Sequence, residues 1–171
     1  MERKIDIIKN DEGNSIAVVN SIRFKGKRSI NWNEVEGYLK QYIGTVTESN
    51  ETVYIGSDLP DEYTGSNYTA KLKGALAKAK ANAAQGIPEM IQIAGNGRVQ
   101  ENLAKKHAYN AKFGWHRYDS RFALPIFDDK GTILRYNVFR AELVIRHAAD
   151  KKLYLYDIIN IKKETSTPLE H

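Results

Sequence analysis

One stretch, residues 114–163, constrains the fold of this 171-residue chain more than any other. Three runs of alternating side chains, rich in β-branched and aromatic residues, cover residues 114–127, 132–147 and 153–161. Two short polar clusters, residues 128–131 and 148–151, separate these runs. Alternation with period two indicates strands, and short polar connections are typical of antiparallel neighbours. We therefore predict a three-stranded antiparallel meander.

The alternation assigns each side chain of the meander to one of two faces, because successive residues of a strand point to opposite sides. The apolar set, which we expect to form a core, is Phe122, Leu124, Ile126, Phe139, Leu143, Ile145, Leu153, Leu155, Ile159 and Ile161. The opposite set is polar and aromatic: Arg117, Asp119, Arg121, Tyr136, Arg140, Glu142, Arg146, Tyr154, Tyr156, Asn160 and Lys162.

This polar face has two interpretations. Antiparallel sheets commonly expose one side to water, so the face can be a solvated surface. Alternatively, Arg121, Arg140 and Arg146 form an anion site, because guanidinium groups suit bidentate contact with phosphate. Glu142 on the same face is then either a partner in acid–base chemistry or a salt-bridge acceptor. The residues alone leave both interpretations open.

The first hundred residues predict a hairpin and about three helices. Extended runs on both sides of residues 10–14 indicate a hairpin. Helices are predicted from Asn31 or Asn33 to about Tyr42, over 69–85 with a further turn from Pro88, and over 98–109. Residues 52–55 are predicted as a short strand, 56–68 as a polar loop and 95–97 as a turn.

These elements predict the α+β class, with an N-terminal hairpin and about three helices packed on a C-terminal antiparallel sheet. The length fits one domain, which we place at residues 1–168. It divides into a hairpin appendage (1–30), a helical part (31–113) and the meander (114–166). Residues 169–171, Leu-Glu-His, are typical of an expression-tag remnant.

The composition excludes several classes of protein. The chain has no cysteine, so disulfides and cysteine metal sites are excluded and a reducing cytoplasm is the expected location. No apolar run approaches the length of a membrane helix and no signal peptide is visible, so we expect no membrane contact. No histidine pair has metal-ligand spacing with carboxylates nearby, and the phosphate-loop and dinucleotide motifs are lacking. We expect neither a metal nor a cofactor.

The charge is unevenly distributed. The formal net charge is +5, made of −3 over residues 1–66, +6 over 67–113, +4 over 114–163 and −2 over the remaining tail. A basic body indicates a polyanionic partner. Ordinary surface lysines on helices explain much of the positive charge of residues 67–113. The basic loop at residues 25–28 is by itself weak support for a phosphate contact.

Acid–base chemistry near neutral pH would call on histidine. His107 lies on the helix predicted before the meander, and His116 and His147 border its strands. A lone histidine is more often structural than catalytic, so the three compete for this role.

Two strings carry a resemblance: Trp115-His-Arg-Tyr-Asp-Ser-Arg-Phe-Ala-Leu-Pro125 and Leu153-Tyr-Leu-Tyr-Asp-Ile-Ile-Asn-Ile-Lys-Lys-Glu-Thr-Ser166. With helices preceding a basic meander, the chain resembles domains near the C-termini of large polyvalent proteins from phages and mobile elements of Gram-positive bacteria. The resemblance covers about residues 30–166. By architecture it extends to the nuclease superfamily of barnase, EndoU, RelE and the colicin ribonucleases.

The resemblance implies a metal-independent endoribonuclease, an effector domain of a larger phage protein that can be delivered with the phage particle. In such enzymes the RNA 2′-hydroxyl attacks the adjacent phosphate with acid–base help and cationic stabilisation. Carried over, His107 is the acid–base candidate, and the contacts to phosphate come from Arg121, Arg140, Arg146, Tyr156 and Thr165. The residues expected to bind the RNA are Arg117, Lys162 and Lys163.

The chain departs from the family in one respect, because no histidine lies inside the second or third strand, where some members place one. The alternative is a non-catalytic module that uses the same face to bind nucleic acid or a phage or host protein.

Overall fold

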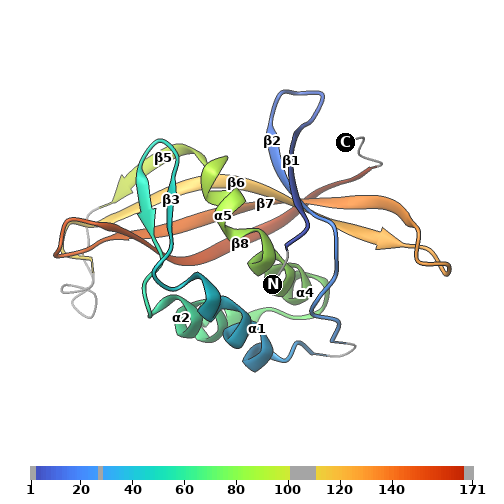
Figure 1. The fold of residues 1–171 in the computed structure, drawn as a ribbon, viewed down its shortest axis with the longest axis horizontal. Helices are drawn as coiled ribbons and strands as arrows, with labels where there is room; N and C mark the ends of the chain where they lie inside the picture. Colours follow the sequence, from blue (N-terminus) through green and yellow to red (C-terminus); the bar gives the residue numbers. More distant parts are fainter. Residues whose placement is uncertain (1–2, 27–28, 101–110, 168–171) are drawn as a thin grey trace.

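The structure is a computed structural model that describes residues 3–26, 29–100 and 111–167. The strands are β1 (Ile5–Lys9), β2 (Ser15–Val19), β3 (Val46–Glu48), β4 (Thr52–Tyr54), β5 (Gly95–Gln100), β6 (Trp115–Phe127), β7 (Ile133–His147) and β8 (Leu153–Thr167). The helices are α1 (Trp32–Leu39), α2 (Leu59–Gly65), α3 (Asn67–Lys71), α4 (Gly74–Ala83) and α5 (Ile87–Gln92), with 3-10 turns η1 (Lys40–Tyr42) and η2 (Ala84–Gly86). Within the described residues the eight strands form one sheet in the order β1-β2-β6-β7-β8-β4-β3, with β5 also paired to β6 (Figure 1).

The predicted meander is confirmed. β6, β7 and β8 are long, consecutive and antiparallel. In the first connection the carboxylate of Asp128 accepts hydrogen bonds from the backbone N–H groups of Lys130 and Thr132, at 2.8 and 2.9 Å. Asp side chains favour turns for this reason. One residue of the predicted apolar set from each strand, Phe122, Leu143 and Leu155, is fully buried.

The alternation fails in β8, where the register with β7 shifts at three places. Each shift inserts one extra residue in β8, and an extra residue turns the following side chains to the other face. Ile158 is therefore buried in the core. Ile159, predicted to be core, is half-buried beside Trp115 and Arg117. That prediction was wrong because period two holds only along an unbroken strand.

The N-terminal hairpin forms where predicted, but it joins the main sheet. β2 pairs in parallel with β6, through Ala17 opposite Phe122 and Val18 opposite Ala123. β4 is likewise parallel to β8. The sheet is therefore mixed, and the prediction of a wholly antiparallel sheet beneath a packed hairpin was wrong. A short alternating run shows that a strand forms, but it does not specify the edge that the strand joins.

The hairpin also covers one end of the polar face. A second small core there consists of Ile16, Val18, Ala123, Tyr136 and Val138. Tyr136, predicted among the polar set, is buried in this core, and its hydroxyl donates a hydrogen bond to Asn20 at 2.9 Å.

The helical part matches the prediction incompletely. The side chain of Asn31 caps α1 by accepting a hydrogen bond from the Asn33 N–H at 3.1 Å, as predicted. Three other expectations were wrong. The loop predicted at 56–68 contains α2 and the start of α3, the helix predicted at 69–85 breaks before Gly74 (φ 59°), and Gly95–Gln100 is a strand instead of a turn entering a helix. The rest of the helix predicted at 98–109 lies outside the described residues.

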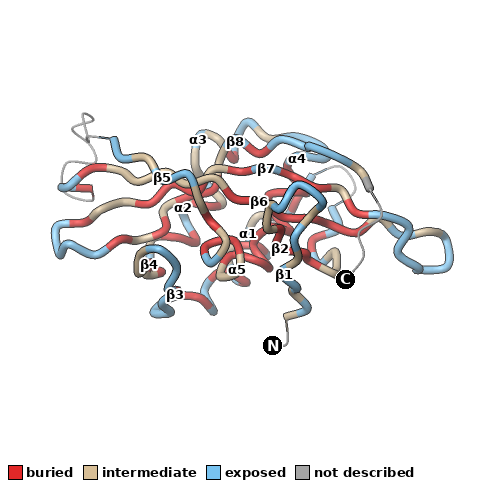
Figure 2. The backbone as a smooth tube through the Cα atoms, turned by 90° about the horizontal axis from the view of Figure 1, so that it is seen from above, coloured by how far each residue is buried: buried red, intermediate tan, exposed pale blue. Residues whose placement is uncertain are grey.

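The main core lies between the helices and one face of the long strands. Figure 2 shows buried positions along the middle of these strands and exposed positions at the hairpin ends. α4 is rich in alanine, and its buried residues include Ala77, Ala79, Ala81 and Ala83. Small side chains let this helix lie close to its neighbours. None of the helices that the structure describes is long and apolar enough to cross a membrane.

A buried ion pair joins α4 to β8. Lys80 and Asp157 have side chains that are 0% and 4% exposed, and their charged atoms are 2.6 Å apart. The Lys80 ammonium also donates a hydrogen bond to the Thr69 hydroxyl at 2.6 Å and lies over the rings of Tyr63 and Tyr68. Lys80 is therefore an exception to the surface lysines expected on the helices of residues 67–113, since helical spacing does not reveal a buried counter-charge.

Candidate nucleic-acid interface

The polar face of the meander carries three cations on adjacent strands, which we call the cation row. Arg121 of β6 lies opposite Arg140 of β7, and Arg140 lies opposite Lys162 of β8. Residues directly opposite share a face, and neighbouring strands are about 4.8 Å apart. Like charges in this position repel and disfavour the pairing. The row therefore needs compensation, either from carboxylates or from a bound anion.

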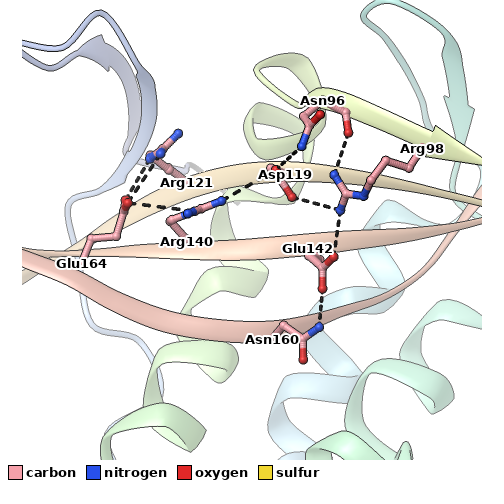
Figure 3. Close-up of polar contacts among 8 residues, drawn as sticks. All are labelled: Asn96, Arg98, Asp119, Arg121, Arg140, Glu142, Asn160 and Glu164. Atoms are coloured by element: carbon pink, nitrogen blue, oxygen red, sulfur yellow. Dashed lines mark hydrogen bonds and ion pairs between the residues drawn. The ribbon is translucent and has the colours of Figure 1, made fainter.

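Carboxylates supply part of that compensation (Figure 3). Glu164 accepts a hydrogen bond from Arg121 Nε at 2.8 Å, and its other oxygen lies 4.0 Å from Arg140 Nε. Asp119 lies 3.7 Å from an Arg140 terminal nitrogen. In the part of the chain that the structure describes, the guanidinium of Arg140 makes no hydrogen bond. Its side chain is 51% exposed, so its five N–H donors can reach an external acceptor.

A second group of charges lies beside the row. Arg98 of β5 contacts Asp119 at 3.1 Å and Glu142 at 2.8 Å. Glu142 also accepts a hydrogen bond from the amide of Asn160 and lies 4.0 Å from Arg117. Glu142 is thus a salt-bridge acceptor in this arrangement, which was one of the two roles predicted for it.

The carboxyl of Asp119 is held in its charged form. Burial alone would raise its pKa, but hydrogen bonds from Asn96 and Arg98 and the charges of Arg98 and Arg140 lower the pKa below 3.8. Hydrogen bonds and nearby cations stabilise a carboxylate in this way. At neutral pH Asp119 therefore stays negative and fixes the guanidinium groups around it.

Arg146 lies apart from the cation row. It is six positions further along β7 than Arg140, about 20 Å along an extended strand. Its Nε donates a hydrogen bond to Asp58 at 3.0 Å, and its guanidinium lies 4.3 Å from the centre of the Tyr154 ring. Tyr156 is near this end as well, with its ring 5.0 Å from that of Trp115. The structure therefore brings Arg121 and Arg140 together but places Arg146 and Tyr156 elsewhere.

The other predicted contact residues are divided between two places. Arg117 donates a hydrogen bond to Gln100 at 3.2 Å, next to the Arg98 group. Lys163 and Thr165 are exposed on β8, beyond Lys162. His107, the predicted acid–base group, lies outside the described residues.

The two described histidines meet at the far end of the meander. The rings of His116 and His147 are 5.4 Å apart. His116 Nδ1 lies 3.4 Å from Glu51, which also accepts a hydrogen bond from Tyr118 at 2.5 Å. His116 alternates with Arg117 and so points to the opposite face from the arginines. Neither described histidine belongs to the cation row.

Sequence reasoning missed two members of this surface. Arg98 was predicted in a helix, and Glu164 lies beyond residues 153–161, the third alternating run. The β-branched residues Thr165 and Thr167 are a signal that β8 continues past Glu164. No comparable local signal marks Arg98, because β5 depends on its pairing with β6.

Comparison of the chain with family models, curated proteins and solved structures gives no match. Among the described residues, no group of three or more His, Asp or Glu side chains is placed to hold a metal ion.

Proposed function

We propose that this chain is a module that binds single-stranded RNA through the cation row on the polar face of its meander. The observation that carries the proposal is Arg140, which lies between two further cations on neighbouring strands and has no hydrogen bond within the described residues. A phosphate placed on it would relieve the repulsion along the row. Guanidinium groups bind phosphate through paired N–H donors.

The balance of charge around the row supports binding of a polyanion. Five cations (Arg98, Arg117, Arg121, Arg140 and Lys162) face three carboxylates (Asp119, Glu142 and Glu164), which leaves two positive charges. The carboxylates are 23–28% exposed, less than Arg140 at 51%. An approaching phosphate backbone would therefore meet the guanidinium of Arg140 before it meets the carboxylates.

Binding is favoured over cleavage by the groups near the row. RNA transphosphorylation needs an acid and a base beside the phosphate, and such groups act best with a pKa near the working pH. His116 and His147 are at the other end of the meander. Cleavage with His107 as acid–base group remains the prediction of the family resemblance, and it is tested in the same experiment.

The test is fluorescence anisotropy of a labelled single-stranded RNA at several salt concentrations. Each phosphate contact with a single strand contributes about −0.7 to the slope of log K against log salt, so three contacts predict a slope of about −2. Arg140→Ala should weaken binding and reduce the steepness of the slope by about 0.7. Arg135→Ala is the matched control, because Arg135 is exposed on the same strand outside the row.

The proposal fails if Arg140→Ala and Arg135→Ala bind RNA as tightly as the unmodified protein. Gel analysis of the same RNA in EDTA separates binding from cleavage. RNA that stays intact would support binding without cleavage. Cleavage that is lost in His107→Ala would support the endoribonuclease.

A further inference from the structure

A separate cleft opens on the helical side of the molecule, between the segment that follows β2 and the start of α4. Its volume is about 580 Å³. The side chains that matter for its chemistry are Lys25, Ile30, Trp32, Leu72, Lys73 and Lys78. Ligand sites for small molecules commonly occupy about 300–1,000 Å³.

The charge of this cleft is uncompensated. Three of its lining residues are lysines, Lys25, Lys73 and Lys78, and none carries a carboxylate. Within the described ranges these three ammonium groups have neither an ion pair nor a hydrogen bond. This differs from the cation row, where carboxylates contact both arginines. A concave surface with one sign of charge concentrates ions of the opposite sign.

The cleft also has apolar and aromatic lining residues. Trp32 begins α1 and is half-buried, and it lines the cleft together with buried Ile30 and half-buried Leu72. An indole that lines a cationic cleft offers a flat surface for a planar ring. Gly26 lies so close to Ser29 that a Cβ at position 26 would be 2.0 Å from the carbonyl oxygen of Ser29. Glycine at this position allows Lys25 and Ser29 to line the same cleft.

We propose that this cleft binds a small phosphorylated ligand with a planar ring, of the nucleoside diphosphate class. The lysines would hold the phosphates and Trp32 would contact the ring. The site uses residues of α1, α4 and the connection after β2, whereas the cation row uses β6, β7 and β8. The proposal therefore does not rest on RNA binding by the row.

The test uses the fluorescence of Trp32 in a Trp115→Phe background, which leaves one tryptophan in the chain. ADP, adenosine and inorganic phosphate are titrated separately. We expect a saturable change with ADP that is at least about tenfold tighter than with adenosine, since charge-assisted hydrogen bonds contribute on this scale. Lys73→Ala and Lys78→Ala should each weaken ADP binding by about tenfold or more. Lys71→Ala, an exposed lysine that does not line the cleft, should leave it unchanged.

Absence of a saturable change with ADP up to about 5 mM, above the millimolar affinity of a weak site, would overturn the proposal. So would equal binding of ADP and adenosine, or full ADP affinity in the lysine variants. Isothermal titration calorimetry of ADP with the protein carrying both tryptophans repeats the measurement without the Trp115 change. Circular dichroism of each variant shows whether it is folded. The Lys73 and Lys78 variants should bind RNA as the unmodified protein does, so failure of one proposal leaves the other intact.

Discussion

Replacing Lys80 by methionine would leave the carboxylate of Asp157 buried without its counter-charge. In the intact protein the two charged atoms are 2.6 Å apart and both side chains are almost fully buried. Removing one partner of a buried ion pair typically costs about 3–5 kcal/mol, because the remaining charge has lost both water and its partner. Asp157→Asn should be destabilising on the same scale, since the buried amine of Lys80 then loses its counter-charge.

The double variant Lys80→Met with Asp157→Asn should be more stable than either single variant. It removes both charges, and a buried ion pair replaced by neutral groups is often close to neutral in stability. The Asn side chain can still accept the hydrogen bond that the Ile158 N–H donates at 2.8 Å. Urea unfolding followed by circular dichroism gives the three free energies of unfolding. A double variant that loses the sum of the two single losses would refute the reasoning.

A pH series provides a second test if the single variants are marginally folded. Burial raises the pKa of Asp157 above 3.8 even with Lys80 present, and removal of Lys80 should raise this pKa further. A raised carboxyl pKa means that the folded state favours the protonated form, so the penalty is present above the folded-state pKa and disappears as the pH falls through it. The loss of unfolding free energy in Lys80→Met, relative to the unmodified protein, should therefore become smaller as the pH falls from neutral. A loss that stays constant with pH would mean that it comes from altered packing.

Three further predictions concern the strands. Ile158→Ala should cost about 2–5 kcal/mol in urea unfolding and Ile159→Ala about 1 kcal/mol or less, because the bulge puts Ile158 in the core; the reverse order would contradict the observed register. Asp119→Asn should be less stable than the unmodified protein above pH 3.8, and the difference should vanish at lower pH, because the lowered pKa of Asp119 gives stability that is lost as the pH falls through it; acid titration of unfolding checks this. Glu164→Gln should tighten RNA binding about fivefold at low salt, since one carboxylate about 4 Å from a cation in water is worth about 1 kcal/mol; unchanged or weaker binding would contradict competition between Glu164 and phosphate.

The meander could be predicted from the sequence because its information is local. Period-two alternation and polar turns specify three strands. The same alternation places Phe122, Leu143 and Leu155 on the apolar face, where they are buried. The same reasoning placed Arg121 and Arg140 on one face, where they lie opposite each other. Asn31 likewise caps α1 through contacts with residues close in sequence.

The errors arose where tertiary contacts override local preference. β5 contains two glycines and does not look like a strand, but pairing with β6 supplies its hydrogen bonds. The alternation of faces fails at the bulges of β8, so that Ile158 instead of Ile159 lies in the core. Arg146 was grouped with Arg121 and Arg140 because the alternation of side chains along a strand assigns a residue to one face of the sheet. It does not give the distance between residues along that face.

The sequence by itself determined the strands of the meander, the polarity of its two faces, the start of α1 at one of two asparagines and the excess of positive charge. Each of these depends on residues a few positions apart. The tertiary structure decided which strands are neighbours, how Lys80 finds Asp157 across 77 residues, and which cations lack a carboxylate partner. Those features depend on strand register and helix placement, which are set by the packing of the whole core and by no single segment of the chain.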